Sequence, residues 1–241
     1  MGCSGIIEPG LAQPEKETRL KDACPCLTPF LARGKMNSVH DMSTARRERL
    51  KHELREEILA AARDLFVREG YASVSIRKIA DAVGCAPGTI YLHFEHKDAI
   101  LGAICLETFS KLDKRMEAIA EDPGDPLGAL RRAGRTYIQF ALDHPYHYLV
   151  TFGEAPRTQV MNGEAHQAGM RSFACLTSCI TRCVEAGLAG FTDVPAVAQA
   201  IWATVHGLAM LLITKQGFPF VEQQRLIDTL LDIAIEGFRR R

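Results

Sequence analysis

The sequence has no excess of charge of either sign. Its 29 Lys and Arg residues are matched by 29 Asp and Glu residues, so the formal net charge is zero at pH 7. Composition alone therefore gives no indication of a nucleic-acid partner. Residues 43–97 hold ten basic against eight acidic side chains, and residues 98–241 hold fourteen against sixteen. Residues 43–97 therefore carry only a small excess of basic side chains.

The sequence also lacks the signals of an exported or lipid-anchored protein. Its N-terminus, MGCSGIIEPG, has no basic region followed by an apolar run, and Ile6 stands where the myristoylation pattern requires Ser or Thr. Eight cysteines in a chain of 241 residues do not indicate a disulfide framework, because the chain has enough apolar residues to build a core without one. We expect a reduced, cytoplasmic protein.

No catalytic set is recognisable in the sequence. It contains no phosphate-cradling glycine loop, no nucleophile elbow and no His-Glu-x-x-His pair. His144 and His147 are close in sequence, but they have no assignable carboxylate partner. We expect neither an enzyme nor a bound cofactor.

The apolar residues recur every three or four positions, and no segment alternates as a half-buried strand does. This pattern predicts an all-α fold of about nine helices. Residues 1–42 are expected to form a disordered tail, because proline and glycine interrupt every period there. The helical elements are expected at 49–69, 76–83, 86–94, 98–120, 127–143, 145–154, 166–186, 193–216 and 221–239, with a loop at 155–163.

The most informative stretch is SVSIRKIADAVGCAPGTIYLHFEHK, residues 73–97. Ser75 is a candidate N-cap, and Gly84 suits the left-handed conformation in which a helix often ends. Pro87 then suits the first turn of a second helix. Two short helices joined by a glycine turn, the second with a small and polar exposed face, predict a helix-turn-helix that binds DNA.

This stretch resembles the signature of TetR/AcrR-family transcriptional regulators. The resemblance covers about residues 46–112 and rests on residues at fixed spacing, namely Ile79-Ala80, Gly84, Pro87-Gly88-Thr89, Tyr91, His93-Phe94 and Lys97. It implies a DNA-binding domain over 46–112, with the helix-turn-helix at about 75–94. It also implies an effector-binding and dimerisation domain over 113–241.

The resemblance implies which side chains contact DNA. Basic residues before the first helix are placed to reach phosphates or a minor groove, and side chains at a helix N-terminus are phosphate candidates. The DNA-binding residues expected are Arg46, Arg47, Ser75, Arg77, Pro87, Gly88, Thr89, Tyr91, His93 and Lys97. The sequence departs from the family at Cys85-Ala86, where Val-Ser is frequent. Because Ala86 cannot cap the second helix, a contact worth about 1 kcal/mol is missing or replaced.

The segment Trp202-x-x-Val205-His206-Gly207 resembles the Trp-His-Gly motif of one C-terminal domain class in this family. Trp202 and His206 lie one turn apart on a helix, where they either line a cavity for a small apolar ligand with a polar end or form a packed core pair. The effector-binding residues expected are Tyr137, Phe140, Tyr148, Phe152, Phe173, Trp202 and His206, with Met170 as a further candidate.

Residues 196–214, within the helix expected at 193–216, form a stretch nearly long and apolar enough to span a membrane. Its polar interruptions favour a soluble core and a subunit interface instead, so we expect no membrane partner. The last two helices are expected to form a four-helix bundle with those of a second subunit. The partners expected are thus a second copy of the chain, a palindromic double-stranded DNA operator and a small-molecule effector.

Cys175, Cys179 and Cys183 recur every four residues along one helix. Three thiols in a row suit a soft metal or a redox sensor, but they equally suit core packing. We expect a DNA-binding transcriptional repressor that an effector releases from its operator. The alternatives are a redox- or metal-responsive regulator and a helical module without a DNA role.

Overall fold

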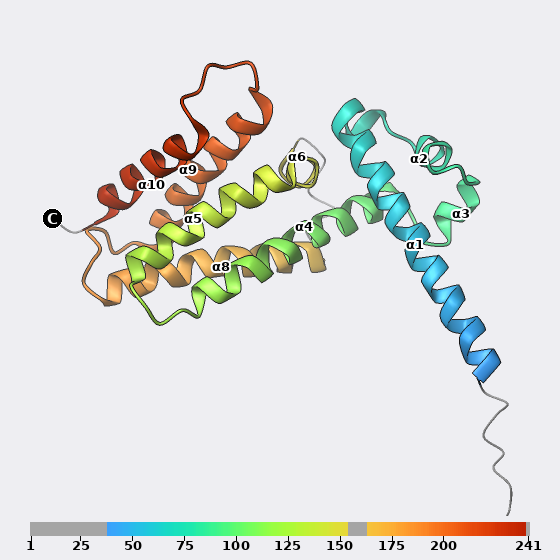
Figure 1. Ribbon diagram of the computed structural model, residues 1–241, viewed down its shortest axis with the longest axis horizontal. Helices are drawn as coiled ribbons and strands as arrows, with labels where there is room; N and C mark the ends of the chain where they lie inside the picture. The colour runs from blue at the N-terminus through green and yellow to red at the C-terminus, as the bar shows by residue number, and fades with distance from the viewer. Residues whose placement is uncertain (1–37, 154–162, 240–241) are drawn as a thin grey trace, which may run out of the picture. The chain divides into compact units, whose positions relative to one another are not determined.

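The computed structural model describes residues 38–153 and 163–239, and its regular elements are helical (Figure 1). These described residues form nine α-helices and one short 3-10 helix, and a single antiparallel bridge joins Ala189 to Arg239. The predicted all-α class is confirmed. The chain divides into two compact units, residues 1–46 and 47–241. Most of the predicted tail over 1–42 and nearly all of the predicted loop over 155–163 lie outside the described residues.

The first helix is longer than the sequence pattern predicted. α1 runs over Ser38–Glu69, whereas we expected a helix over 49–69 after a tail ending at residue 42. No glycine or proline lies between Ser38 and Arg49, so nothing in this segment interrupts the helix. The last part of the predicted tail is therefore helical.

The elements after α1 are η1 (Tyr71–Ser73), α2 (Ile76–Val83), α3 (Pro87–Tyr91) and α4 (Lys97–Ala120). The second helix of the predicted motif is shorter than the expected 86–94, because the next helix begins close behind it. The His96 Nδ1 accepts a hydrogen bond from the Ala99 backbone N–H at 3.0 Å and so caps α4.

The backs of these helices share one buried core. Apolar side chains from α1, α2, α3 and the first half of α4 meet there. The largest contributors include Ile58, Phe66, Ile79, Ile90, Phe94, Ile100 and Ile104. Burial of several fully enclosed side chains, each worth roughly 1.5–3 kcal/mol, holds the short helices in place although they would not be stable alone.

The rest of the chain forms α5 (Pro126–Asp143), α6 (Pro145–Phe152), α8 (Glu164–Glu185), α9 (Val194–Thr214) and α10 (Gln223–Phe238). Carboxylates cap three of these helices. Asp125 accepts from the Leu127 and Gly128 N–H groups, and Asp193 accepts from that of Ala196. Glu222 accepts from the N–H groups of the first turn of α10. A proline in the first turn opens α5, α6 and α9.

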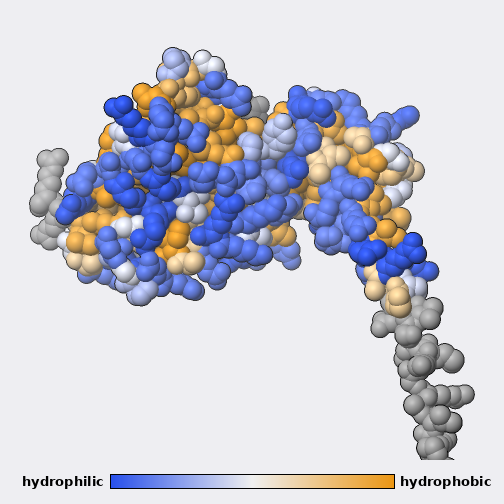
Figure 2. Space-filling view, viewed as in Figure 1, coloured by the Kyte–Doolittle hydropathy of each residue, from blue (hydrophilic) through white to orange (hydrophobic). Residues whose placement is uncertain are grey.

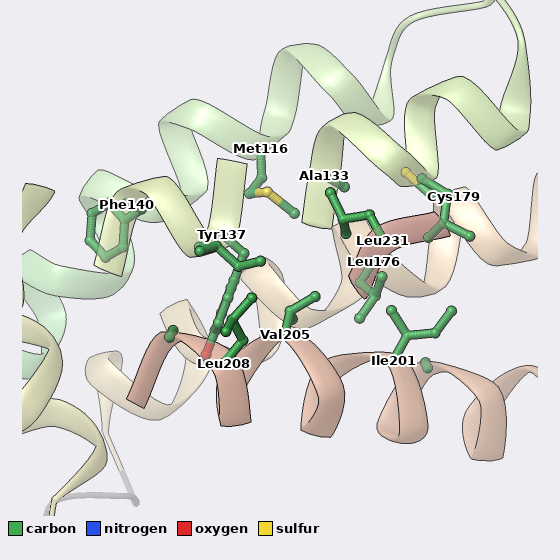
Figure 3. Packing of buried hydrophobic residues seen from close by; sticks show 14 of the residues in the cluster. Met116, Ala133, Tyr137, Phe140, Leu176, Cys179, Ile201, Val205, Leu208 and Leu231 are labelled. Carbon is green, nitrogen blue, oxygen red and sulfur yellow. The ribbon is translucent and has the colours of Figure 1, made fainter. Parts of the chain in front are cut away.

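α5 lies at the centre of this part and packs against α4, α8, α9 and α10. Side chains from these helices point toward one another in the core, as Figure 3 shows for Met116, Ala133, Tyr137, Leu176 and Val205. Gly134 of α5 allows close approach, because a Cβ there would lie 2.6 Å from the Leu231 Cδ2 of α10.

α9 is, among the described helices, the one that is long and apolar enough to cross a membrane by length and composition. One of its faces packs in the core through residues such as Ala198, Val205 and Leu208. Its other face and the following loop expose apolar side chains, including Leu211, which is 47% exposed, and Phe218, which is 61% exposed. Figure 2 shows hydrophobic surface gathered over α9 and α10.

Candidate functional site

The turn between α2 and α3 is fixed by interactions that are local in sequence. The Ser75 Oγ accepts a hydrogen bond from the Lys78 backbone N–H at 3.2 Å. Gly84 ends α2 with a φ of 79°, and its N–H donates to the Ala80 carbonyl oxygen at 2.9 Å. Pro87 occupies the first turn of α3. The predicted cap, stop and start are confirmed, and together they form a helix-turn-helix.

The outward face of α3 is small and polar. Ile90 is fully buried and anchors the helix, whereas Tyr91 is 55% exposed. Pro87 and Gly88 are exposed as well, and Thr89 is half-buried beside them. A Cβ on Gly88 would meet no atom within 4 Å, so the backbone at this point is open to an approaching molecule. This composition fits a helix that enters a DNA major groove.

Ala86 stands at the N-cap of α3 and makes no side-chain capping hydrogen bond. The first N–H groups of α3 therefore have no side-chain partner from this position, as the Cys85-Ala86 departure predicted. Pro87 has no N–H and the Thr89 N–H donates to the Ala86 carbonyl oxygen at 2.9 Å, which leaves the Gly88 N–H to donate to a phosphate oxygen.

Basic side chains lie on the surface of both units. Arg46 is exposed in the unit of residues 1–46, and Arg47 is exposed in the unit of residues 47–241. Arg77 is exposed in the first turn of α2. The Ser75 hydroxyl beside it already accepts the capping bond, which leaves its proton available to donate to a phosphate.

His93 is half-buried just after α3. Its pKa is lowered from the ordinary value by burial, and the nearby cations Lys51 and Arg55 lower it further. In the free protein His93 is therefore neutral at pH 7. Its ring can then donate one hydrogen bond and accept another.

Lys97, predicted to contact DNA, makes contacts within the protein. Its Nζ donates to the backbone carbonyl oxygens of Tyr71 and Val74, each at 2.8 Å, and lies 4.1 Å from the centroid of the Tyr71 ring. The ammonium therefore ties the start of α4 to η1.

A cavity of about 390 Å³ lies among α4, α5, α6, α8 and α9. Its wall is mostly apolar and aromatic, with polar atoms at a few points. The main lining residues are Phe109, Leu112, Met116, Tyr137, Thr151, Phe152, His166, Met170, Ser172, Phe173, Leu176, Gln199, Ile201, Trp202 and Val205. Volume and lining are those of a site for a drug-sized molecule.

A hydrogen-bonded cluster of four side chains stands at one side of the cavity. The Tyr137 hydroxyl accepts from the Trp202 Nε1–H at 3.0 Å and lies 3.0 Å from the Tyr148 hydroxyl. The Tyr148 hydroxyl lies 2.6 Å from the His206 Nδ1. Burial raises the pKa of Tyr137 to about 12 and raises that of Tyr148 still further, so both phenols stay protonated. The two neutral phenols, the indole N–H and the imidazole thus lie within hydrogen-bonding distance of one another.

The predicted effector residues divide into three groups. Tyr137, Phe152, Phe173 and Trp202 line the cavity, and so does Met170. Tyr148 and His206 do not line it but bond to the residues that do. The third group is Phe140 alone.

Phe140 is the predicted effector residue that lies apart from the cavity. It is fully buried in the core and does not line the cavity. Its ring centroid lies 5.0 Å from that of His144 and 5.4 Å from the Arg115 guanidinium carbon. Phe140 lies three residues from Tyr137 on α5, close enough in sequence to seem equivalent.

The sequence pattern also missed several residues of the cavity wall. Phe109 and Met116 of α4 line the cavity but were not among the predicted effector residues. His166 and Gln199 were not candidates at all, although both line it. No local signal marks these side chains, because the wall exists only where five helices meet.

His147 of α6 lies in a polar cluster beside the core of the helix-turn-helix. Its Nε2 is 2.8 Å from an Arg63 nitrogen of α1, 3.3 Å from the Glu107 Oε1 and 3.5 Å from the Lys111 Nζ. The hydrogen bond to His147 is the main cause that lowers the pKa of Glu107 to about 2. His147 therefore does have the carboxylate partner that sequence alone could not assign.

The cysteine stripe of α8 has the character of core packing. Cys179 and Cys183 are buried and Cys175 is half-buried. Burial raises the pKa of each of the three thiols, in the case of Cys183 to about 11. A protonated, buried thiol is a poor nucleophile and a poor metal ligand. Within the described residues, no group of three or more His, Cys, Asp or Glu side chains is placed to hold a metal ion.

An exposed helix-turn-helix defines the class of DNA-binding proteins, and in this chain α4 joins it to helices that enclose an apolar cavity. Models of known protein families match both the N-terminal and the C-terminal part of the chain. Residues 58–104 match the model described as bacterial regulatory proteins, tetR family, and residues 130–237 match that described as tetracyclin repressor-like, C-terminal domain. The chain belongs to the TetR family of transcriptional regulators and is a DNA-binding regulator.

Individual relatives support this assignment. The HTH-type transcriptional regulator AcrR of Shigella flexneri is 39% identical over 80 residues, which cover 33% of this chain and 37% of that protein. The HTH-type transcriptional regulator TtgR of Pseudomonas putida is 28% identical over 193 residues, which cover 75% of this chain and 91% of that protein.

The fold is also that of solved TetR-family structures. PfmR from Thermus thermophilus is similar with a TM-score of 0.63 at 22% identity, over 76% of this chain and 96% of that one. FadR from Bacillus subtilis, solved in complex with stearoyl-CoA, is similar with a TM-score of 0.65 at 20% identity, over 76% of this chain and 98% of that one. At these identities the structures establish the fold alone.

Proposed function

We propose that this protein is a cytoplasmic, homodimeric repressor that leaves its operator when a small molecule fills the cavity. The continuity of α4 is the observation that carries this proposal. Ile100, Leu101 and Ile104 of its first turns belong to the core of the helix-turn-helix. Phe109 and Met116 of its later turns line the cavity. A change in the cavity wall thus acts on the same helix that supports the DNA-binding motif.

α6 supplies a second connection between the two sites. Thr151 and Phe152, at its end, line the cavity. His147, one turn earlier, contacts Arg63 of α1 and Glu107 of α4. A ligand that displaces the Phe152 ring therefore acts on a helix that also contacts α1.

We propose the DNA-binding domain over 46–112 and the effector and dimer domain over 113–241. In the first, Thr89, Tyr91 and His93 face the groove, with Pro87 and Gly88 allowing close approach. Phosphates are bound by side chains around this surface, namely Arg46, Arg47, Ser75 and Arg77. Lys97 supports the motif through its hydrogen bonds to the carbonyl oxygens of Tyr71 and Val74.

The exposed apolar surface of α9 and α10 supports the dimer. A four-helix bundle formed with the same helices of a second copy would cover Leu211 and Ile233, which are 47% and 70% exposed. Two recognition helices about 34 Å apart would then require a palindromic operator.

The apolar wall supports an effector with a large hydrophobic part. The Trp202 and His206 positions and their bonded tyrosines support placement in the Trp-His-Gly class of C-terminal domains. A FadR of the same fold binds stearoyl-CoA. A difference of about 1–3 kcal/mol in effector affinity between the DNA-bound and free conformations would weaken operator binding about 5- to 150-fold.

Selection of bound sequences from random duplex DNA tests the proposal. We expect the full-length protein at moderate salt to enrich a palindrome with two equal half-sites. Tyr91→Ala should lose this enrichment. Tyr146→Ala is the matched control, because Tyr146 of α6 is similarly exposed, at 48%, and should leave the selected sequence unchanged. Failure of the wild-type protein to prefer any sequence in a salt-dependent manner would overturn the proposal.

A further inference from the structure

Several polar side chains of the cavity wall bond to protein partners, and one buried nitrogen is an exception that points to the ligand. The Thr151 hydroxyl donates to the Thr108 hydroxyl at 2.9 Å, and the Ser172 hydroxyl donates to the Asp113 Oδ1 at 3.2 Å. Tyr137 is satisfied within its cluster.

The exception is the Nδ1 of His166. It is buried and makes no hydrogen bond to any described residue. A buried polar atom without a partner costs about 1–3 kcal/mol, so native structures rarely keep one without a use.

His166 lies in the first turn of α8, and its buried Nδ1 belongs to a side chain of the apolar cavity wall. A neutral imidazole has a single N–H, and a buried N–H without an acceptor is rarer than a buried acceptor without a donor. The proton therefore belongs on Nε2, and Nδ1 offers a lone pair.

Aromatic side chains form much of the cavity wall to which His166 belongs. Gly169, one turn along α8, has no side chain, and a Cβ there would lie 3.1 Å from the Phe109 ring. The rings of Phe152, Phe173 and Trp202 form other parts of the wall, with Phe173 and Trp202 edge-to-face at 6.0 Å. The described lining of the cavity contains no Asp, Glu, Lys or Arg side chain. An ion would enter without a partner, at a large cost in desolvation.

We propose that His166 is the polar anchor of the cavity and that the effector is an uncharged aromatic molecule that donates a hydrogen bond to its Nδ1, as a phenol does. The proposal rests on the assignment of this cavity as the effector site. It adds the chemical class of the ligand and the residue that selects it.

A displacement assay on the full-length protein tests the proposal. The probe is N-phenyl-1-naphthylamine, a neutral aromatic dye that fluoresces in apolar sites. Trp202 is the single tryptophan of the chain and lines the cavity, so energy transfer from Trp202 reports that the dye is inside. The competitors are 4-phenylphenol, its methyl ether 4-methoxybiphenyl, and the anion biphenyl-4-carboxylate.

We expect 4-phenylphenol to displace the dye at a concentration about tenfold lower than the ether, which cannot donate. The carboxylate should compete least. His166→Leu should abolish the difference between phenol and ether while the dye still binds. His166→Asn should retain it, because the amide oxygen replaces the lone pair of Nδ1. Gln167→Leu, an exposed neighbour on α8, is the control and should behave as the wild type.

The outcomes separate the two proposals. Dye binding with energy transfer but equal competition by phenol and ether in the wild type would overturn the role of His166 and leave the effector cavity standing. Strongest competition by the carboxylate would overturn the uncharged class. Absence of energy transfer from Trp202 to the dye at saturation would overturn both the anchor and the cavity as the effector site.

Discussion

The buried hydroxyls of Thr108 and Thr151 offer a test of how α4 and α6 are joined beside the cavity. The Thr151 hydroxyl donates to the Thr108 Oγ1 at 2.9 Å, and the Thr108 hydroxyl donates to the Ile104 carbonyl oxygen at 2.8 Å. Thr108 is fully buried and Thr151 is 8% exposed. The bonds run in one direction, so the two hydroxyls are not equivalent and their removal should not cost the same.

Valine replaces each threonine with nearly the same shape and without the hydroxyl. Thr151→Val removes one neutral hydrogen bond and leaves Thr108 bonded to Ile104, so it should lower the free energy of unfolding by about 1 kcal/mol. Thr108→Val leaves the Thr151 hydroxyl buried without an acceptor and should cost about 1–3 kcal/mol. The double variant leaves neither group unsatisfied. It should cost less than the two single losses together, by about 1 kcal/mol or more.

Equilibrium urea unfolding measures these differences, at one protein concentration for all variants because dimerisation makes stability concentration-dependent. Thr177→Val is the control, since Thr177 is half-buried and its hydroxyl bonds to the Ala174 carbonyl oxygen of its own helix; its effect should stay within about 0.5 kcal/mol. Strictly additive single losses, or a larger loss for Thr151→Val than for Thr108→Val, would refute the directional arrangement.

Three other sites give further predictions. Gly84→Ala places a side chain on a residue with left-handed backbone and should lower the free energy of unfolding by about 1–2 kcal/mol. Gly88→Ala should leave the free energy of unfolding unchanged and weaken operator binding in a gel-shift titration. Equal stabilities of the two variants would contradict this prediction. Folding lowers the Glu107 pKa from 4.5 to about 2, so the stability that the ionised Glu107 adds is present above pH 4.5 and is lost as the pH falls toward 2. Glu107→Gln should therefore be less stable than the wild type at pH 7 and should lose less stability on acidification. Parallel curves of urea midpoint against pH for the two proteins would exclude this role of Glu107. Burial raises the pKa of Cys183 to about 11, so this thiol should react slowly. Mass spectrometry after alkylation of the native protein with iodoacetamide should find Cys85 modified well before Cys183. The reverse order would support a reactive role for the cysteines of α8.

The helix-turn-helix could be predicted from the sequence because its determinants are local. The Ser75 cap acts over three residues, Gly84 sets its own backbone, and Pro87 opens the helix that it belongs to. Each of these interactions has a fixed spacing along the chain, so the sequence displays it directly. The missing side-chain cap at Ala86 was visible for the same reason.

The role of Lys97 was not visible in this way. Its two acceptors are carbonyl oxygens of the Tyr71–Val74 region, more than twenty residues earlier. Only the packing of α4 against η1 brings the ammonium and these two oxygens together.

The cavity depended most on tertiary structure. The sequence indicated that aromatic residues of the C-terminal part meet around Trp202, and four of the seven predicted side chains do line the cavity. It could not separate Tyr137 from Phe140, since both belong to the buried side of α5 and only the neighbouring helices decide which one faces a hollow. Nor could it show that His166 keeps an unbonded nitrogen there. The hydrophobic pattern of a helix determines which of its faces is buried. Which side chains that face contacts, and whether it borders a cavity, depends on helices that are distant in sequence.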